Sequence, residues 1–479
     1  MKIAHRFHDF SRIGPVYLVG GSVRDSVLNR RSSDHDFVVP GNVRTFAEKV
    51  AKGLGVRLIE LGKDSEAICR VVSGDEILDF SPMEGNCIEE DLKRRDFTVN
   101  GLGYDLRTKR LIDPVKAMDD IKSRTIRLIS KDAVVADPLR MIRAFRFAAV
   151  LGFDIAPETL AVISKKSALI GQSAGERISI ELFKMMEVKR SFYHLKQMSD
   201  SGLLTNIIPE LEPCRECFQN EIHARDVFEH TMATYDEMET ALINHAVLWP
   251  DYARSISSYL RAHDRRVLLK LATLFHDLGK PGTRSVDSTG KVRFLGHEDE
   301  GADIVQDICA RLRMSGKNRS YITLIVQKHL QPLFLFDAHQ RDSLTSRGII
   351  RFAGKYRDDI IGLLIHSVAD QRAKAGLGSE FLSDFIKFSA GVLSMYFSGL
   401  RPKIVAPRLL NGHEVMEYFN LKPSELIGRL LQTVEDARLN GDIETKKEAT
   451  GLVARLLELE GDAGIEPATP SSGGLCSIR

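Results

Sequence analysis

The spacing of apolar residues divides the chain into an N-terminal part of short strands and helices and a longer helical part. "PVYLVGG" at residues 15–21 is an apolar run that ends in two glycines, and it predicts a buried strand followed by a turn. "DHDFVV" at 34–39 predicts a second strand, and 43–55 has helical spacing that ends at a glycine. Residues 67–81 predict a hairpin that turns at Gly74. This mixture predicts an α+β domain of modest size.

From about residue 126 onward, the apolar positions recur with the period of a helix. Asp137 followed by Pro138 predicts a helix start, in which the aspartate caps the helix and the proline occupies its first turn. The helix should end at Gly152. Further helices are predicted over 176–198, 226–247, 264–278, 298–313 and 319–330.

These patterns predict five successive parts of the chain. They are a head (1–125), a helical neck (126–225), a third domain (226–375), a helical C-terminal region (376–460) and a disordered tail (461–479). The tail is predicted from its Gly, Pro and Ser content and its few apolar residues.

Composition narrows the class of protein. The chain has 479 residues, of which 43% are hydrophobic and 28% charged, as expected of a soluble globular protein. We find no apolar run of about 18 residues and no signal-peptide pattern, so we expect a cytoplasmic protein with no membrane partner. The six cysteines are scattered, and the lone pair Cys214 and Cys217 does not indicate a structural zinc site.

The net charge of +2 does not by itself indicate a nucleic-acid-binding protein. However, residues 107–132 and 137–147 are locally rich in arginine and lysine. A local basic surface is enough to neutralise phosphates.

The first chemical pattern combines glycines with carboxylates. In a strand, Asp34 and Asp36 project to the same face, where two carboxylates repel unless a cation lies between them. Oxygen ligands favour Mg²⁺ or Mn²⁺. Taken alone, this pair could be the solvated start of a strand, and the glycines at 20–21 could be a tight turn. With Asp79 on a later strand, the set predicts phosphoryl transfer with one cation at a 3′-hydroxyl and another on a triphosphate.

Four segments in this order resemble a known family. They are residues 17–39, 89–105 ("EEDLKRRDFTVNGLGYD"), 137–153 ("DPLRMIRAFRFAAVLGF") and 176–182 ("ERISIEL"). They resemble the successive motifs of the bacterial tRNA nucleotidyltransferases, the CCA-adding family with a polymerase-β-like head. The implied fold is a small mixed-sheet head followed by an all-helical neck and body.

The resemblance implies roles for individual residues. Asp34 and Asp36 would hold Mg²⁺, and Asp79 would be a third catalytic carboxylate, with a buried strand aspartate as the alternative. The candidate nucleotide-binding residues are Gly20, Gly21, Arg24, Asp25, Arg94, Arg95, Asp96, Asn100, Arg143 and Arg146.

Asp137 and Arg140 are the candidate readers of the incoming base. They lie three residues apart and therefore on one helix face. Cytosine and adenine both offer an amino donor beside a ring-nitrogen acceptor, which an aspartate and an arginine can match. Uracil and guanine reverse this order and would leave buried polar groups mismatched. The alternative is a helix cap and a surface arginine. In the family, this pair reads CTP and ATP without a nucleic-acid template.

Two departures from the family pattern leave the product open. Ala136 stands where the family usually has a glutamate that steadies the arginine. The segment between Asp79 and Arg94 is short, whereas many CCA-adding relatives have a longer flexible segment there and CC-adding relatives lack it. We therefore keep both CC addition and full CCA addition to the tRNA 3′ end. A bacterial poly(A) polymerase and a non-catalytic RNA-binding protein are the alternatives.

A second set of residues indicates a metal site in the third domain. The candidate ligands are His230, His276, Asp277 and Asp370. Imidazole and carboxylate together suit a transition metal such as Mn²⁺ or Ni²⁺. The "HD" pair at 276–277 resembles the HD metal-dependent phosphohydrolases, which implies phosphatase or cyclic phosphodiesterase activity. His297 and His329 would be ligands of a second ion, and the alternative is a helical domain that only grips tRNA.

Overall fold

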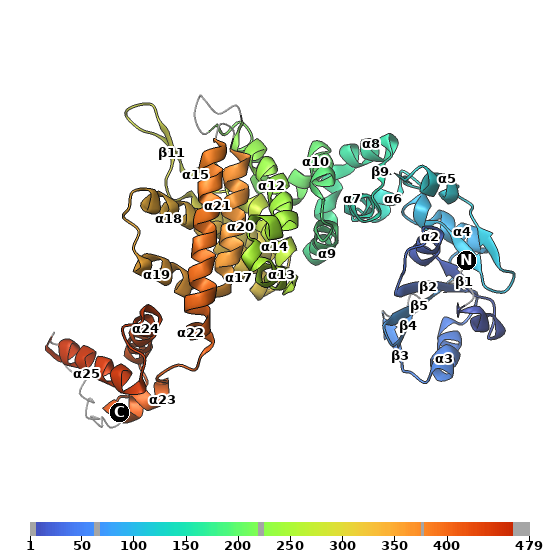
Figure 1. Ribbon diagram of the computed structural model, residues 1–479. Helices are drawn as coiled ribbons and strands as arrows, with labels where there is room; N and C mark the ends of the chain where they lie inside the picture. Colours follow the sequence, from blue (N-terminus) through green and yellow to red (C-terminus); the bar gives the residue numbers. More distant parts are fainter. Residues whose placement is uncertain (1–5, 62–67, 219–224, 375–377, 463–479) are drawn as a thin grey trace, which may run out of the picture. The chain divides into compact units, whose positions relative to one another are not determined.

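The computed structural model describes residues 6–61, 68–218, 225–374 and 378–462 (Figure 1). The chain forms two compact units. The first consists of Met1–Glu239 and Arg266–Gln327, and the second of Thr240–Arg265 and Lys328–Arg479. Within the described ranges, no helix is long and apolar enough to cross a membrane.

The head contains a seven-stranded sheet with the order β3-β4-β5-β2-β1-β6-β7. Its strands are β1 (Tyr17–Val19), β2 (Asp34–Val39), β3 (Leu58–Leu61), β4 (Ile68–Ser73), β5 (Glu76–Pro82), β6 (Gly103–Asp105) and β7 (Arg110–Ile112). β2 and β5 pair in parallel, and the other neighbours are antiparallel. The predicted mixed-sheet head is therefore confirmed.

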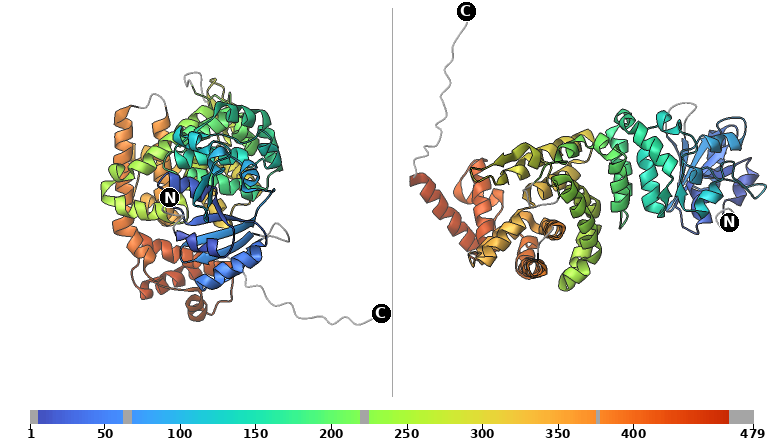
Figure 2. Two further views of the ribbon diagram at one scale, coloured as in Figure 1. Left: turned by 90° about the vertical axis from the view of Figure 1, so that its right-hand side faces the viewer. Right: turned by 90° about the horizontal axis from the view of Figure 1, so that it is seen from above.

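One face of this sheet is an aromatic core. The rings of Phe37 on β2 and Phe80 on β5 stack with centroids 5.0 Å apart. Helix α3 (Val43–Leu54) packs Phe46 on Phe80, with a centroid distance of 5.7 Å. Figure 2 shows α3 running along the sheet. Burial of these large rings fixes which residues of β2 face inward.

The opposite face carries the acidic residues. Val38 packs with Leu92 of α4 (Ile88–Lys93) in a second small core. Because side chains alternate along a strand, Asp34 and Asp36 lie on the same face as Val38. The pattern "DHDFVV" thus places two carboxylates beside a core that holds their strand in register.

Helices make up most of the remaining chain. In the first unit, the structure has η1 (His8–Arg12), α2 (Gly21–Val27), α5 (Ala117–Lys122), α6 (Ala133–Ala136), α7 (Arg140–Leu151), α8 (Pro157–Lys166), α9 (Gly175–Met186), α10 (Phe192–Asp200), α11 (Leu203–Ile207), α14 (Arg265–Phe275), α15 (Lys280–Thr283), α16 (His297–Arg311) and α17 (Gly316–Lys328). Helix α12 (Val227–Leu248) begins in the first unit and ends in the second. The second unit has α13 (Ala253–Arg261), α18 (Gln331–Gln340), α19 (Ser346–Tyr356), α20 (Ile360–Ala373), α21 (Ser379–Ser394), α22 (Arg401–Val405), α23 (Gly412–Phe419), α24 (Glu425–Asn440) and α25 (Lys446–Asp462).

The elements differ from the prediction in three places. Regular helix begins at Arg140 rather than at Pro138, although the Asp137 carboxylate accepts the N–H of Leu139 as a cap would. Short strands β8 (Thr125–Ile126), β9 (Asp154–Ile155), β10 (Arg284–Val286) and β11 (Val292–Phe294) interrupt the part predicted as wholly helical. The helix α25 extends through the first two residues of the predicted tail, and residues 463–479 lie outside the described ranges.

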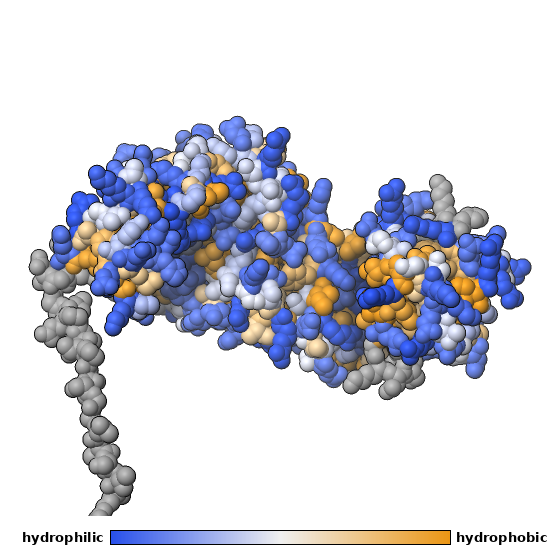
Figure 3. Space-filling view, turned by 90° about the horizontal axis from the view of Figure 1, so that it is seen from below, coloured by the Kyte–Doolittle hydropathy of each residue, from blue (hydrophilic) through white to orange (hydrophobic). Residues whose placement is uncertain are grey.

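Apolar side chains remain on the surface of the head. β3 lies at the edge of the sheet, and exposed apolar side chains occur on it and on β4, among them Ile59, Leu61, Ile68 and Val72. Figure 3 shows apolar patches on the surface of the head.

A buried ion pair breaks the predicted helix 176–198 into α9 and α10. Lys270 Nζ donates to the carbonyl oxygens of Met186 and Val188, at 2.9 and 2.7 Å, where α9 ends. Glu239 accepts the N–H of Ser191, at 2.7 Å, where α10 begins. Lys270 and Glu239 are themselves 2.7 Å apart. Each charge therefore meets the helix end of opposite partial charge, and burial lowers the pKa of Lys270.

We predict that Lys270→Met destabilises the first unit by about 3–5 kcal/mol, because Glu239 would be left buried without its cation. The free energy of unfolding is measured by denaturant titration. Hydrogen exchange of the backbone amides in α9 and α10 measures the loss locally. Lys196→Met removes a lysine from an exposed pair with Asp200 and should cost less than about 0.5 kcal/mol. Equal losses in the two variants would contradict the prediction.

Candidate functional site

The Gly20–Gly21 turn brings the backbone close to an arginine. Gly20 has φ +68°, a conformation that favours glycine. A Cβ at this position would lie 2.8 Å from Nη1 of Arg95 and 3.7 Å from a carboxylate oxygen of Asp36. A side chain at position 20 would therefore push Arg95 away from Asp36.

A chain of hydrogen bonds joins the first, second and third motifs. Arg24 donates to Asp25, at 2.9 Å, and to the side-chain oxygen of Asn100, at 2.5 Å. Asn100 donates to Asp96, at 2.9 Å, and Arg143 on α7 lies 2.6 Å from the second oxygen of Asp96. Residues far apart in the sequence thus form one continuous polar network.

These groups line a cavity of about 290 Å³. Its lining consists of Gly20, Gly21, Arg24, Asp36, Arg95, Asp96, Asn100, Arg140, Arg143 and Phe147. Nine of these ten were predicted as site residues, and Phe147 was not. Its buried ring lies beneath the guanidinium groups of Arg24, Arg143 and Arg146, at 3.9 to 5.6 Å from its centroid.

Three carboxylates gather along the paired strands β2 and β5. Asp36 pairs in register with Asp79, and Asp34 lies two residues before it. Desolvation raises the pKa of Asp36; Arg95 opposes this rise, and Asp79 and Asp34 add to it. Asp36 keeps part of its surface open toward the cavity. An oxygen-preferring cation at Asp34 and Asp36 would offset this crowding of negative charge, so the residues fit the predicted Mg²⁺.

Asp79 already has a cation. Arg70 on β4 donates two hydrogen bonds to it, at 2.8 and 2.7 Å, in a bidentate pair. Arg70 was not among the residues predicted from the sequence. Because both oxygens of Asp79 are engaged, the geometry favours the alternative that Asp79 is a paired strand aspartate, and its catalytic role stays a prediction.

The side chains of Asp137 and Arg140 form no hydrogen bond or ion pair with each other in the described structure, although the N–H of Arg140 donates to the carbonyl oxygen of Asp137 at 3.1 Å. Asp137 is 2.9 Å from a guanidinium nitrogen of Arg177 on α9. Arg140 makes long contacts, at 3.5 Å, with the carbonyl oxygens of Ala133 and Arg94. Arg140 has no carboxylate partner in the ranges that the structure describes, so it is available to a ligand.

Helix α9 joins both ends of this region through two residues four apart. Arg177 binds Asp137, and Glu181 lies 2.5 Å from Arg146, which is four-fifths or more buried. Both belong to "ERISIEL", so the signal was present in the sequence, but only the structure shows what they bind. We call Arg177 and Glu181 the α9 clasp.

Six predicted residues of the head and neck lie outside the cavity lining, namely Asp25, Asp34, Asp79, Arg94, Asp137 and Arg146. The contacts of Asp25 and Arg94 are to neighbouring charged side chains. Asp25 holds Arg24 through two guanidinium nitrogens. Arg94 forms an ion pair with Glu84 on the segment before α4. Asp25 and Arg94 therefore contact neighbouring side chains and not the cavity itself.

The first unit contains four of the predicted residues of the second metal site. Asp277 is fully buried, and its carboxylate lies 3.1 Å from His276, 3.8 Å from His230 and 3.5 Å from His297. Lys280 donates to it at 2.7 Å. Burial opposes ionisation of Asp277, but His276 and Lys280 lower its pKa well below the usual range. Histidine nitrogens around one carboxylate fit a transition metal.

The remaining predicted ligands lie in the second unit. Asp370 on α20 accepts hydrogen bonds from Gln371 and Lys374, both at 2.9 Å. The ring of His329 lies 5.8 Å from that of His366, and both are buried. The ligand roles of Asp370 and His329 stay predictions from the sequence.

Three family models match successive parts of the chain. The model of the poly A polymerase head domain matches residues 16–127. A model described as a probable RNA- and SrmB-binding site of polymerase A matches 152–215, and the HD domain model matches 242–373.

Full-length relatives decide the family. The A-adding tRNA nucleotidyltransferase of Deinococcus radiodurans is 32% identical, over 92% of this chain and 95% of the relative. The chain belongs to the tRNA nucleotidyltransferase family. The CC-adding tRNA nucleotidyltransferase of Thermus thermophilus is 30% identical, over 93% of this chain and 95% of its own. A multifunctional CCA protein of Stenotrophomonas maltophilia is 31% identical over 71% of this chain.

Solved structures of similar proteins agree on the fold of this tRNA nucleotidyltransferase. A CCA-adding enzyme in complex with CTP has a TM-score of 0.63 at 20% identity and covers 95% of this chain and 96% of its own. The Thermotoga maritima CCA-adding enzyme complexed with tRNA has a TM-score of 0.59, also at 20% identity. The predicted order of a mixed-sheet head and a helical body is thereby confirmed.

Proposed function

We propose that this protein adds nucleotides to the 3′ end of tRNA in the cytoplasm, without a template, from CTP or from CTP and ATP. The observation that carries the proposal is the single cavity lined by Asp36, the Gly20–Gly21 turn and the arginines of three motifs. Family membership favours this function over poly(A) addition and over RNA binding without catalysis. A cavity with carboxylates at one end and arginines around it suits a triphosphate held beside a metal site.

Each side of the cavity has a distinct task in this proposal. Asp34 and Asp36 would hold Mg²⁺, which when bound supplies charge stabilisation for phosphoryl transfer. Arg24 and Arg95 would bind triphosphate oxygens, since guanidinium groups match them in bidentate geometry. Asp96 is held by Asn100 and Arg143 and would accept a hydrogen bond from the ribose.

Asp137 and Arg140 would read the base, and Arg177 would position Asp137. A glutamate is absent at 136, where Ala136 is exposed at the end of α6. Arg177 supplies a different support, because its 2.9 Å contact orients the Asp137 carboxylate. In this ion pair, the side chain of Arg177 is about half exposed. Such pairs are weak, so an incoming base can compete for the carboxylate.

How many nucleotides are added is a separate question. The relatives include an A-adding, a CC-adding and a multifunctional CCA protein at similar identity. In this chain, the short connection between β5 and α4 is held by hydrogen bonds from Glu84 N–H to Asp91 and from Asn86 N–H to Glu90. These hydrogen bonds hold a short connection in place, whereas many CCA-adding relatives have a longer flexible segment there. The short, held connection therefore supports CC addition.

Incubation with tRNA that ends at the discriminator base, at C or at CC, each with CTP or ATP, separates the products. We expect CTP to extend the first two substrates. Extension of the CC substrate by ATP would rule out CC-only addition, and long runs of A would support a poly(A) polymerase instead.

We predict that Asp36→Ala lowers nucleotide transfer by roughly a thousandfold or more, because a metal ligand worth several kcal/mol is lost. Binding of tRNA, measured by filter retention, should persist. Asp9→Ala, an exposed aspartate in the same head, is the matched control and should transfer normally. Transfer by Asp36→Ala at the wild-type rate would refute the metal role.

We predict that Arg177→Ala relaxes base selection by roughly two- to fivefold, the range expected from an exposed ion pair. The measurement is the ratio of kcat/KM for CTP to that for UTP, with KM for tRNA unchanged. Arg177→Lys should keep most of the selectivity. Arg190→Ala removes a similarly exposed arginine from its pair with Asp236 and should leave the ratio as it is. An unchanged ratio in Arg177→Ala would show that the pair does not position Asp137.

We further propose that the HD domain hydrolyses phosphoesters with a bound transition metal such as Mn²⁺ or Ni²⁺. The residues His230, His276 and Asp277 lie together in the first unit, and the sequence assigns Asp370 as a further ligand. Phosphatase or 2′,3′-cyclic phosphodiesterase activity could clean RNA ends before nucleotide addition.

We predict that Asp277→Asn abolishes hydrolysis of a cyclic phosphodiester and leaves nucleotide transfer intact. The asparagine keeps the shape of the buried side chain, and Asp303→Ala on the surface of α16 is the control. Hydrolysis is measured with Mn²⁺, Ni²⁺, Co²⁺ and Mg²⁺ in turn. Failure of the wild-type protein with all four ions would refute this activity.

A further inference from the structure

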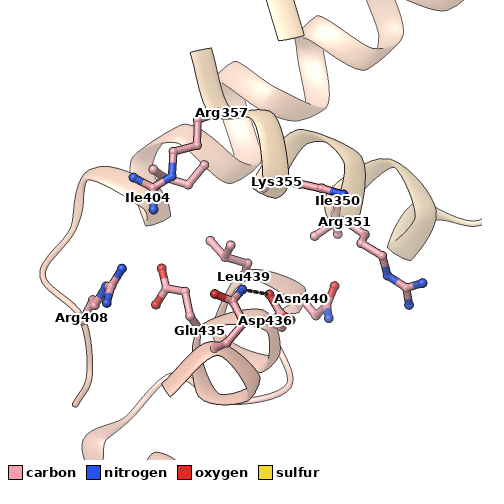
Figure 4. A pocket seen from close by; sticks show the side chains of 12 residues that line it. Ile350, Arg351, Lys355, Arg357, Ile404, Arg408, Glu435, Asp436, Leu439 and Asn440 are labelled. Carbon is pink, nitrogen blue, oxygen red and sulfur yellow. Dashed lines mark hydrogen bonds between the residues drawn. The ribbon is translucent and has the colours of Figure 1, made fainter. Parts of the chain in front are cut away.

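The second unit contains a cavity that none of the proposed activities uses. It lies among α19, α22 and α24 and has a volume of about 490 Å³. Figure 4 shows α19 on one side of it, α24 on the other, and Arg408 on the loop between α22 and α23. Its lining consists of Ile350, Arg351, Gly354, Lys355, Arg357, Ile404, Arg408, Gln432, Glu435, Asp436, Leu439 and Asn440.

Four of the lining residues are exposed cations whose side chains have no anionic partner. Arg351, Lys355, Arg357 and Arg408 form no side-chain hydrogen bond or ion pair with any residue that the structure describes. Lys355 lies 5.5 Å from the ring centroid of Tyr356, which leaves its charge uncompensated. Guanidinium and ammonium groups that line one cavity without anionic partners attract an anion.

The acidic residues of the same cavity are already engaged. Both oxygens of Glu435 accept hydrogen bonds from Arg438, at 2.6 and 2.9 Å. Arg438 is buried and also donates to the carbonyl oxygen of Lys403. Asp436 accepts a hydrogen bond from Gln432 at 2.9 Å. The ion pair of Glu435 and Arg438 is neutral, so the four cations outweigh the single charge of Asp436.

Arg357 has an unusual backbone conformation beside the cavity. Arg357 ends α19 with φ +52° and ψ −132°, a conformation that favours glycine. A non-glycine residue keeps such strain only where its surroundings fix it. Figure 4 shows this arginine extending toward Ile404 at the cavity.

The walls of the cavity also contain apolar surface. Ile350 on α19, Ile404 on α22 and Leu439 on α24 contribute to the lining. The volume falls within the range of about 300–1,000 Å³ that is typical of small-molecule sites. A ligand that fits both the cations and this apolar surface carries a phosphate at one end and an apolar group at the other.

We propose that this cavity binds a small phosphorylated molecule of the nucleotide class. The phosphate contacts Arg357 and Arg408, Arg351 binds the ligand from the opposite side of the cavity, and the base lies against the apolar wall. A passing RNA strand fits less well, because its backbone would use the cations and leave the apolar hollow empty. The proposal is independent of nucleotide transfer in the head.

Calorimetric titration of the full-length protein with AMP, ATP and inorganic phosphate tests the proposal. The buffer contains EDTA, which removes divalent cations from the head and the HD site. We expect saturable binding of AMP, and the double variant Arg351→Ala, Arg408→Ala should weaken it by about tenfold or more, since two charge-assisted hydrogen-bonding groups are lost. Both arginines are exposed, so the fold should survive their removal.

The matched control is Arg347→Ala on the same helix, whose arginine pairs with Asp442 outside the cavity lining. It should bind AMP as the wild-type protein does. The proposal is overturned if no nucleotide binds, if the double variant binds like the wild type, or if phosphate alone binds as tightly as AMP. It is also overturned if the double variant loses tRNA affinity but keeps AMP binding, because the cations would then contact the RNA backbone.

Discussion

Repulsion between carboxylates is the constraint on which the head depends. The parallel pairing of β2 and β5 brings Asp36 level with Asp79, and Asp34 adds a third negative charge. Sheet hydrogen bonds and the aromatic core hold these strands in place, so the carboxylates cannot move apart. Arginines from neighbouring segments compensate instead, with Arg70 on Asp79 and Arg95 beside Asp36. A site built in this way is held ready for a cation.

Arginines of helix α7 pair with carboxylates of the head and of the neck. Arg143 binds Asp96 of the head, and Arg146, which lies over the ring of Phe147, binds Glu181 of α9. Asp137, three residues before α7 begins, is held by α9 as well. The proposed phosphate-binding residues and the proposed base-reading residues are therefore connected through one helix. A shift of α7 would alter both sets of residues together.

Local patterns were predictable, and contacts between distant residues were not. β2 has the bounds that alternation predicts, because its apolar face is buried and its register follows from that. The break between α9 and α10 was missed, because it depends on Glu239 and Lys270, which are 48 and 79 residues from Ser191. The candidate site residues were predicted from their motifs, and nine of them line one cavity. Their partners Arg70 and Arg177 were not predicted, since nothing in the spacing says which carboxylate an arginine will meet.

The α9 clasp separates the support of the proposed base reader, Asp137, from the reader itself. Asp137 belongs to the segment before α7, whereas Arg177 belongs to another helix and is half exposed. In the proposed mechanism, substitutions at Arg177 change selectivity in small steps without altering the proposed metal site or the reading residues. Sequence changes at such a position alter nucleotide preference gradually. They offer a physical route by which one scaffold could diverge into enzymes with different nucleotide preferences.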